Sequence, residues 1–354
     1  MKTLIKFSSK PEVIPTSTSW YLTDLAESRG KQDLFTRQSP QKLKVLREHA
    51  LIESAISSNR IEGVEVDQKR VATVIFGKSH LKDRDEEEVR AYRTALSLIH
   101  EESSNLAVSE KTIKRLHRLS RAGLGDAGKY KAKESNIIER YGDGRERIRF
   151  KTVSASETPK FMHQLVNLWR QAISESWVPS LITLAAFNLD FLCIHPFRDG
   201  NGRVSRLLIL LQCYQLGFEV GKYISLERLV EQNKERYYET LEQSSQGWHA
   251  GKHDPWPYIN YLLFILKMAY REFEQRVGEI SAPRGAKSEL VAGAIHRHHR
   301  AFRVSDLQRD CPGVSVDLIR QVLKKFRVRG QVRCLGRGQN AKWEKTGKWR
   351  LAAN

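Results

Sequence analysis

The twelve residues HPFRDGNGRVSR, at positions 195–206, are the part of this sequence that most constrains its fold. The apolar run LAAFNLDFLCI (184–194) precedes them, and a second apolar run, LLILLQCYQLG (207–217), follows them. Runs of this length and character predict two buried helices, and the Gly- and Asn-rich segment between them predicts a tight turn. A polar turn therefore lies at the end of a helical core.

The residue types in this turn predict a phosphate site. Gly200 and Gly202 allow backbone amides to approach a ligand closely. The first turn of the helix that follows offers unpaired N–H groups to an anion. Arg203 and Arg206 are three residues apart, so they share one side of a helix and can hold phosphate oxygens together.

Two further residues of the turn supply chemistry. The Asp199 carboxylate is a hard oxygen ligand suited to Mg²⁺, which commonly takes one or two carboxylates plus substrate phosphates. His195 is suited to act as a general base near neutral pH. The alternative is a simple polar turn between two core helices, with a capping Asp and a hydrogen-bonded His. The presence of all these parts within twelve residues favours the phosphate site.

The stretch resembles the signature of the Fic (Fic/Doc) family, H-P-F-x-(D/E)-G-N-G-R-x-x-R, at every defined position. The resemblance covers roughly residues 39–276 and implies an all-α fold, the Fic-fold helical bundle with a small β-hairpin flap. It also implies a protein adenylyltransferase that transfers AMP from ATP, with Mg²⁺, to a Ser, Thr or Tyr hydroxyl of a target protein. In the implied site His195 deprotonates that hydroxyl, and ATP is bound by Arg198, Asp199, Gly200, Asn201, Gly202, Arg203, Arg206 and Tyr238.

A helix is predicted over about 40–63, ending at Gly63. Its last residues, from Ser58 to Gly63, resemble the inhibitory motif (S/T)-x-x-x-E-(G/N) that many Fic proteins carry. The resemblance implies that Glu62 pairs with Arg206, the arginine meant for the γ-phosphate, and thereby misplaces the nucleotide. The alternative is a surface helix whose Glu62 has no partner.

A β-hairpin is predicted where Ile137-Ile138 and Ile148-Arg149-Phe150 flank the turn residues Gly142-Asp143-Gly144. The resemblance implies that this hairpin, at about 135–152, is a flap that clamps the target by adding a strand to it. The target-facing residues would be Ile148, Arg149, Phe150, Lys151 and Thr152. Without the resemblance, the hairpin is only a surface excursion.

The pair Tyr237-Tyr238 lies on or just beyond a helix predicted to begin at Ser225. A Tyr-Tyr pair recurs in the Fic family near the nucleotide base, and an aromatic core pair is the alternative. Family members often place an Asn seven residues after the pair to contact adenine, whereas this chain has Ser245 there. The departure leaves the preference for ATP over other nucleotides open.

Other segments predict supporting structure. Residues 1 to about 30 predict an extended arm with Pro11 and Pro15. The segment 85–99 predicts a helix whose acidic first turn is solvated, and Ser109 predicts the cap of the next helix, whose His117 is structural. Further helices are predicted at 157–174, 178–194, 207–216 and 256–276.

The C-terminal region has a different composition. After the short linker 281–287, helical patterns at 289–298, 305–309 and 315–327 precede two short strands at 331–335 and 341–344. Residues 284–354 contain 17 Lys and Arg against 5 Asp and Glu, a net charge of +12 out of +19 for the chain. This order resembles a winged helix-turn-helix domain, with Arg320, Lys324 and Lys325 facing DNA. The alternative is a winged helix that mediates protein contacts or dimerisation.

Length and composition predict three regions within the 354 residues: 1–110, 111–280 and 281–354. Four scattered cysteines without a CxxC pair indicate neither a disulfide framework nor zinc, and they fit a reducing cytoplasm. No apolar run is long enough for a membrane span. Expected partners are the hydroxyl-bearing target protein, a second copy of the chain as a homodimer, the chain itself as a target, and DNA.

Two alternatives to AMP transfer remain. The first is a DNA-binding transcriptional regulator that uses the Fic-like core as a nucleotide sensor or as a silent scaffold. The second is different chemistry at the same site, namely removal of AMP or transfer of UMP or phosphate.

Overall fold

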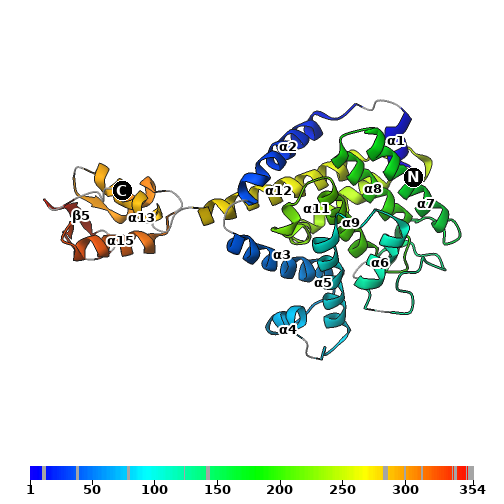
Figure 1. The fold of residues 1–354 in the computed structure, drawn as a ribbon, viewed down its shortest axis with the longest axis horizontal. Helices are drawn as coiled ribbons and strands as arrows, with labels where there is room; N and C mark the ends of the chain where they lie inside the picture. The colour runs from blue at the N-terminus through cyan, green and yellow to red at the C-terminus, as the bar shows by residue number, and fades with distance from the viewer. Residues whose placement is uncertain are drawn as a thin grey trace. The chain divides into compact units, whose positions relative to one another are not determined.

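The computed structural model describes residues 1–9, 13–36, 40–77, 80–122, 124–140, 144–281, 286–298, 300–311, 314–336, 338, 341–347 and 349. The chain is mainly helical with small antiparallel sheets, as the sequence predicts. It divides into two compact units, Met1–Gln275 and Arg276–Asn354 (Figure 1).

The first unit is built around α8 (Ser180–Ile194) and α9 (Asn201–Gln215), which pack against each other at its centre (Figure 1). Every residue from Leu181 to Ile194 is buried, as expected for a helix that is apolar on all sides. The neighbours of α8 are α1 (Thr3–Ser9), α7 (Thr158–Glu175) and α11 (Lys234–Ser245). The neighbours of α9 are α3 (Pro40–Ile61), α5 (Arg84–Glu102) and α6 (Glu110–Ser120).

The remaining helices of this unit complete the bundle. They are α2 (Thr16–Thr36), η1 (Gln68–Arg70), α4 (Val71–Phe76), η2 (Val220–Lys222), α10 (Leu226–Gln232), η3 (Trp248–Ala250) and α12 (Trp256–Ser281). The predicted caps are confirmed, because the hydroxyl groups of Ser109 and Ser225 accept hydrogen bonds from the first turns of α6 and α10. Gly63 adopts a left-handed conformation just beyond α3, as a helix stop does.

One expectation about the helices is wrong. The N-terminal segment forms α1 and α2 instead of an extended arm, and the N–H groups of Thr3 and Leu4 donate to the buried Asp190 carboxylate of α8 at 2.9 and 3.0 Å. This tertiary contact overrides the weak local signal; Pro11 lies outside the described residues. Helix α9 begins at Asn201 and therefore carries Arg203 and Arg206, as predicted, in addition to the apolar residues 207–216. Asn233 divides the segment after Ser225 into α10 and α11.

The predicted hairpin is confirmed. Strands β1 (Ile137–Arg140) and β2 (Glu146–Phe150) pair antiparallel, with Ile138 opposite Ile148 and an irregularity next to Ile137. Residues 142 and 143 of the predicted turn lie outside the described residues.

The second unit contains α13 (Ala286–Arg297), β3 (Phe302–Arg303), α14 (Val304–Asp310), α15 (Val316–Val328), β4 (Val332–Cys334) and β5 (Lys342–Lys345). The three strands form an antiparallel sheet in the order β3-β5-β4. The core includes Phe302, Leu307, Ile319 and Leu323, which come from a strand and two helices. The two-residue strand β3 was not predicted, because so short a strand leaves no periodic pattern.

Among the described helices, none combines the length and the apolar character that a membrane crossing needs.

Candidate active site

The turn between α8 and α9 has a fixed backbone. Helix α8 ends at His195, which takes the left-handed conformation with φ 53° and ψ 62°, and Gly200 is also left-handed, with φ 79°. Asn201 closes the turn, since its side chain accepts from Phe197 N at 2.9 Å and donates to Phe197 O at 2.8 Å. The Phe197 ring is fully buried and stacks on the His117 ring at 3.8 Å. These contacts fix the turn that carries His195.

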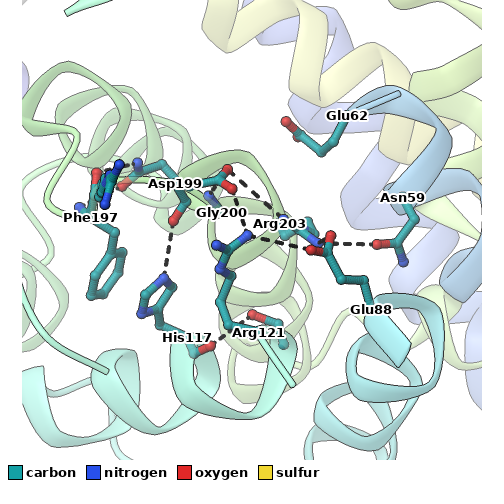
Figure 2. Close-up of polar contacts among 12 residues, drawn as sticks. Asn59, Glu62, Glu88, His117, Arg121, Phe197, Asp199, Gly200 and Arg203 are labelled. Atoms are coloured by element: carbon teal, nitrogen blue, oxygen red, sulfur yellow. Dashed lines mark hydrogen bonds and ion pairs between the residues drawn. The ribbon is translucent and has the colours of Figure 1, made fainter. Parts of the chain in front are cut away.

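His117 connects α6 to this turn. Its Nδ1 accepts from Gly128 N at 2.8 Å, and its Nε2 lies 3.0 Å from Asp199 O (Figure 2). A neutral ring with its proton on Nε2 satisfies both contacts. Burial lowers the pKa of His117 to about 4, which agrees with a neutral ring that fixes the Asp199 carbonyl.

The Asp199 carboxylate is oriented but accessible, with 54% of its side chain exposed. Its Oδ2 accepts from Arg121 Nη1 at 2.6 Å, and its Oδ1 accepts from Gly200 N at 2.6 Å (Figure 2). Partial burial raises the pKa of Asp199, but the guanidinium groups of Arg121 and Arg203 outweigh that effect and hold it below its usual value. The carboxylate is ionised at neutral pH, as a cation ligand must be.

Arg203 points into the protein, where its side chain is 2% exposed. Its Nη1 donates to Glu88 Oε2 at 2.5 Å and to Asn59 Oδ1 at 3.3 Å, so α9 is joined to α5 and α3 (Figure 2). Glu88 also accepts from Arg84 at 3.0 Å and lies 3.7 Å from Arg121. The expectation that the acidic turn of α5 is solvated is therefore wrong for two residues. Glu88 is buried among three arginines, and Glu86 is buried and paired with Arg70.

Replacing Glu88 by alanine is expected to destabilise the protein, because it leaves the Arg203 guanidinium buried without its carboxylate. Loss of one partner of a buried ion pair costs about 3 kcal/mol or more. Thermal and urea unfolding of Glu88→Ala should show this loss. Glu87→Ala, at the exposed neighbouring position, is the matched control and should unfold like wild type. Equal stability of both variants would contradict a structural role for the Glu88–Arg203 pair.

Arg206 is held by the end of α3. Its Nε donates to Ser58 Oγ at 2.8 Å, and its Nη2 donates to Ser58 O at 2.9 Å and to Glu62 Oε1 at 2.7 Å. The side chain is 3% exposed, and among the described residues Nη1 has no hydrogen-bond partner. Burial lowers the pKa of Arg206, but the Glu62 carboxylate, together with Tyr237 and Tyr92, raises it by more, so the guanidinium is charged.

Gly202 separates Glu62 from the backbone of α9. A Cβ atom at this position would lie 2.3 Å from Glu62 Oε1 and 3.2 Å from Arg206 Nη1. The Glu62 carboxylate therefore occupies the space that the glycine leaves open, beside the unpaired nitrogen of Arg206. An anion held by this first turn of α9 and by Arg206 would compete with Glu62 for the same place.

A cavity of about 390 Å³ opens at this point. It is lined by Glu62, His195, Gly202 and Arg206. Further lining residues come from α8, the hairpin and α11: Leu189, Leu192, Cys193, Ile137, Ile138, Arg149, Phe150, Tyr237, Tyr238, Leu241, Glu242 and Ser245. The rings of Tyr237 and Tyr238 lie 5.2 Å apart. Arg149 closes the hairpin onto α11, because its Nη2 donates to Tyr238 O at 2.6 Å and lies 3.0 Å from Glu242. The size and the mixed polar and apolar walls suit a nucleotide.

His195 is half-buried at the edge of this cavity. Burial and the nearby Lys131 ammonium lower its pKa to about 4, although Glu62 and Asp199 act in the opposite direction. The imidazole is therefore neutral at pH 7 and can accept a proton.

The other predicted residues lie at the surface or at the base of the hairpin. Arg198 is exposed, and its carbonyl accepts from Ser135 at 3.3 Å. In the hairpin, Ile148 is 60% exposed, Lys151 is exposed beyond the end of β2, and Thr152 is buried. In the second unit, three predicted basic residues project from the exposed face of α15: Arg320, Lys324 and Lys325.

Three site-supporting residues were not predicted as such: Glu88, Arg121 and Lys131. His117 was predicted to be structural, and its contacts with the turn agree with that prediction. The structure buries all four side chains beside the turn. For Glu88, the local sign would have been a carboxylate on the same helix side as buried Val89 and Tyr92. Arg121 and Lys131 lie in segments where nothing local distinguishes them from surface residues.

Residues 107–213, which include the hairpin and the whole 195–206 stretch, match the family model described as Fic/DOC family. The chain contains a Fic/DOC family domain. A Fic family protein from Desulfovibrio desulfuricans G20 is similar in structure, with a TM-score of 0.62 and 22% identity over 97% of this chain and 99% of that one.

Two further solved Fic structures share the fold. A Fic domain containing signaling protein from Bacteroides thetaiotaomicron has a TM-score of 0.61 and 22% identity, covering 72% of this chain and 97% of that one. Fic-1 from C. elegans has a TM-score of 0.58 and 18% identity, with 74% of each chain covered. At these identities the likeness concerns the fold, and the Fic domain supports a transferase role in general terms.

Proposed function

We propose that the protein is an adenylyltransferase that transfers AMP from ATP to a hydroxyl side chain of a target protein. The observation that carries this proposal is that one cavity is lined by a neutral His195, by Gly202 in the first turn of α9 and by Arg206. In the proposed reaction the target oxygen attacks the α-phosphorus, the bond to the β-phosphate oxygen breaks, and pyrophosphate leaves. His195 takes the hydroxyl proton.

The chain's own residues fit the nucleotide in three respects. The unpaired Nη1 of Arg206 and the space beside Gly202 suit the terminal phosphates. The pair Tyr237-Tyr238 and Ser245 line the part of the cavity where a base would lie. Arg203 is already bound to Glu88, so we assign it to stiffening the turn and leave phosphate binding to Arg206.

Asp199 fits a magnesium ion, because its carboxylate is exposed, ionised and fixed by Arg121. A single carboxylate suffices when phosphates and water complete the coordination. When bound, Mg²⁺ would neutralise phosphate charge. Among the described residues no cluster of three acidic, His or Cys side chains forms a separate metal site.

We further propose that Glu62 inhibits the enzyme. It holds Arg206 by an ion pair of 2.7 Å and fills the space beside Gly202, which are the two features assigned to the phosphates. Nucleotide binding in a productive position therefore requires Glu62 to leave.

To test the reaction, the protein is incubated with labelled ATP, Mg²⁺ and a host lysate. Mass spectrometry of the labelled proteins then identifies the group transferred. Adenylylated hydroxyl residues would support the proposal. Transfer of UMP from UTP or of phosphate from ATP, with no AMP adducts, would replace it with the corresponding chemistry. Release of AMP from modified protein would indicate the reverse reaction.

A second function, DNA binding by the C-terminal unit, is favoured by its charge distribution. Each described acidic side chain of this unit forms an ion pair with a basic residue of the same unit: Asp306, Asp310, Asp317 and Glu344. Among the described residues, Lys324, Lys325, Arg327 and Arg329 of α15 and its end are exposed and have no such acid partner. The exposed basic side of α15 differs from its buried side, which includes Ile319 and Leu323, as on a helix that enters a major groove.

Changing Lys324 and Lys325 to alanine is expected to weaken duplex DNA binding and to reduce the slope of log affinity against log salt by about 2, one for each lost phosphate contact. Gel shifts or fluorescence anisotropy at several salt concentrations measure this. The control is the pair Arg300→Ala and Arg309→Ala, which leaves α15 intact. Salt-insensitive or absent binding by wild type would assign the unit to protein contacts.

A further inference from the structure

Lys131, in the segment between α6 and β1, is a buried lysine with 4% exposure. Its Nζ donates to Thr152 Oγ1 at 2.8 Å and to Ile194 O at 3.2 Å. Its backbone N–H donates to Pro196 O at 2.8 Å. One residue thus binds the carbonyl groups on both sides of His195.

Thr152 links the same lysine to both strands of the hairpin. It lies two residues beyond the end of β2, and its N–H donates to Asn136 Oδ1 at 3.2 Å, next to the start of β1. Its Oγ1 accepts from Lys131 and donates to Ser135 O at 3.0 Å. The base of the hairpin is therefore joined to the end of α8 through the Lys131 ammonium group.

The conformation of His195 needs such support. A residue other than glycine rarely adopts the left-handed conformation, and it keeps this conformation only where several surrounding contacts hold it there. Inside the protein the N–H of His195 bonds to Phe191 O, which fixes one side of the residue. The two carbonyl contacts of Lys131 fix the peptide that precedes His195 and the peptide that follows Pro196.

We propose that Lys131 is a positioning residue that holds His195 in its left-handed conformation and couples the histidine to the hairpin. The catalytic meaning of this coupling rests on the proposed AMP transfer, whereas the contact itself does not. In that reaction the hairpin presents the target hydroxyl, and Lys131 keeps His195, the proposed general base, aligned with that hydroxyl.

The charge of Lys131 also affects the pKa of His195. Among the described residues, the charged groups that act on the His195 ring are Lys131, Glu62 just after α3 and Asp199 in the turn. Burial lowers the pKa of Lys131 to about 8, with Glu134 acting in the opposite direction, so the ammonium is mainly charged at pH 7. A nearby cation disfavours protonation of the imidazole, and its removal should allow His195 to protonate at higher pH.

The test compares Lys131→Met, Lys131→Arg and Thr152→Val in the full chain, with folding checked by circular dichroism. The pKa of His195 is measured by NMR titration without nucleotide, and its signal is assigned from the spectrum of His195→Ala. We expect Lys131→Met to raise this pKa by about 1 unit, as loss of a neighbouring cation does, and Lys131→Arg to leave it near the wild-type value. An unchanged pKa in folded Lys131→Met would overturn the electrostatic part of the proposal.

Thr152→Val tests the coupling with a nearly isosteric change that should fold. We expect amide hydrogen exchange in residues 191–200 to become at least about tenfold faster, since the Lys131 bridge loses its anchor in the hairpin. Exchange at wild-type rates would overturn the coupling, and it would do so even if Lys131→Met did not fold.

Turnover measurements then distinguish a failure of this proposal from a failure of the proposed AMP transfer. Where wild type transfers AMP, Lys131→Met should lower kcat at least about tenfold with little change in the KM for ATP, and Lys131→Arg should recover part of that loss. Equal kcat values would refute the positioning role. If wild type transfers no AMP, the proposed function fails, while NMR and hydrogen exchange still decide whether Lys131 holds His195.

Discussion

Replacing His195 by alanine is expected to abolish AMP transfer, with a fall in kcat of at least about 10²- to 10⁴-fold, the range that general-base catalysis contributes. His195 lines the cavity and its imidazole is neutral at pH 7, because burial and Lys131 lower its pKa to about 4. Steady-state transfer of labelled AMP measures the effect. Nucleotide affinity should change little, because the phosphate-binding parts remain.

The control for this substitution is His163→Ala, since the His163 side chain is 71% exposed on α7. It should transfer AMP at the wild-type rate. If His195→Ala retained most of its activity while binding ATP normally, another group would have to take the hydroxyl proton, and the proposed mechanism would be wrong.

The second large effect is expected from Glu62→Gly, which should raise AMP transfer about 10- to 150-fold. That range corresponds to the roughly 1.5–3 kcal/mol of a hydrogen bond to a charged group, converted to a shift in population. Removing the carboxylate frees Arg206 Nη2 and clears the space beside Gly202. The γ-phosphate then meets an arginine already oriented by Ser58.

Glu65→Gly is the matched control, because Glu65 is an exposed glutamate just beyond the end of α3. Titration of ATP affinity should accompany the rate measurement. Equal labelling by wild type and Glu62→Gly would rule out inhibition by Glu62. A rise with Glu65→Gly as large as that with Glu62→Gly would point instead to general loosening of α3.

The helical core could be predicted because its signals are local. The apolar runs on either side of residues 195–206, the Ser109 and Ser225 caps and the Gly63 stop all act within one or two helical turns. The hairpin was equally visible, because its alternating strands flank a glycine-rich turn. The N-terminal helices were missed because α1 depends on Asp190, almost two hundred residues away.

The candidate site divides in the same way. The chemical parts can be read from residues 195–206: a histidine, a carboxylate, a glycine-containing turn and the arginines at 198, 203 and 206. How Arg203 and Arg206 are used depends on the tertiary structure, because a guanidinium binds whichever carboxylate the packing brings near. Packing brings Glu88 to Arg203 and Lys131 to the carbonyl groups on both sides of His195, over separations that no local pattern encodes. The pair of Glu62 with Arg206 was implied by the resemblance of residues 58–63 to the inhibitory motif, and the structure contains it.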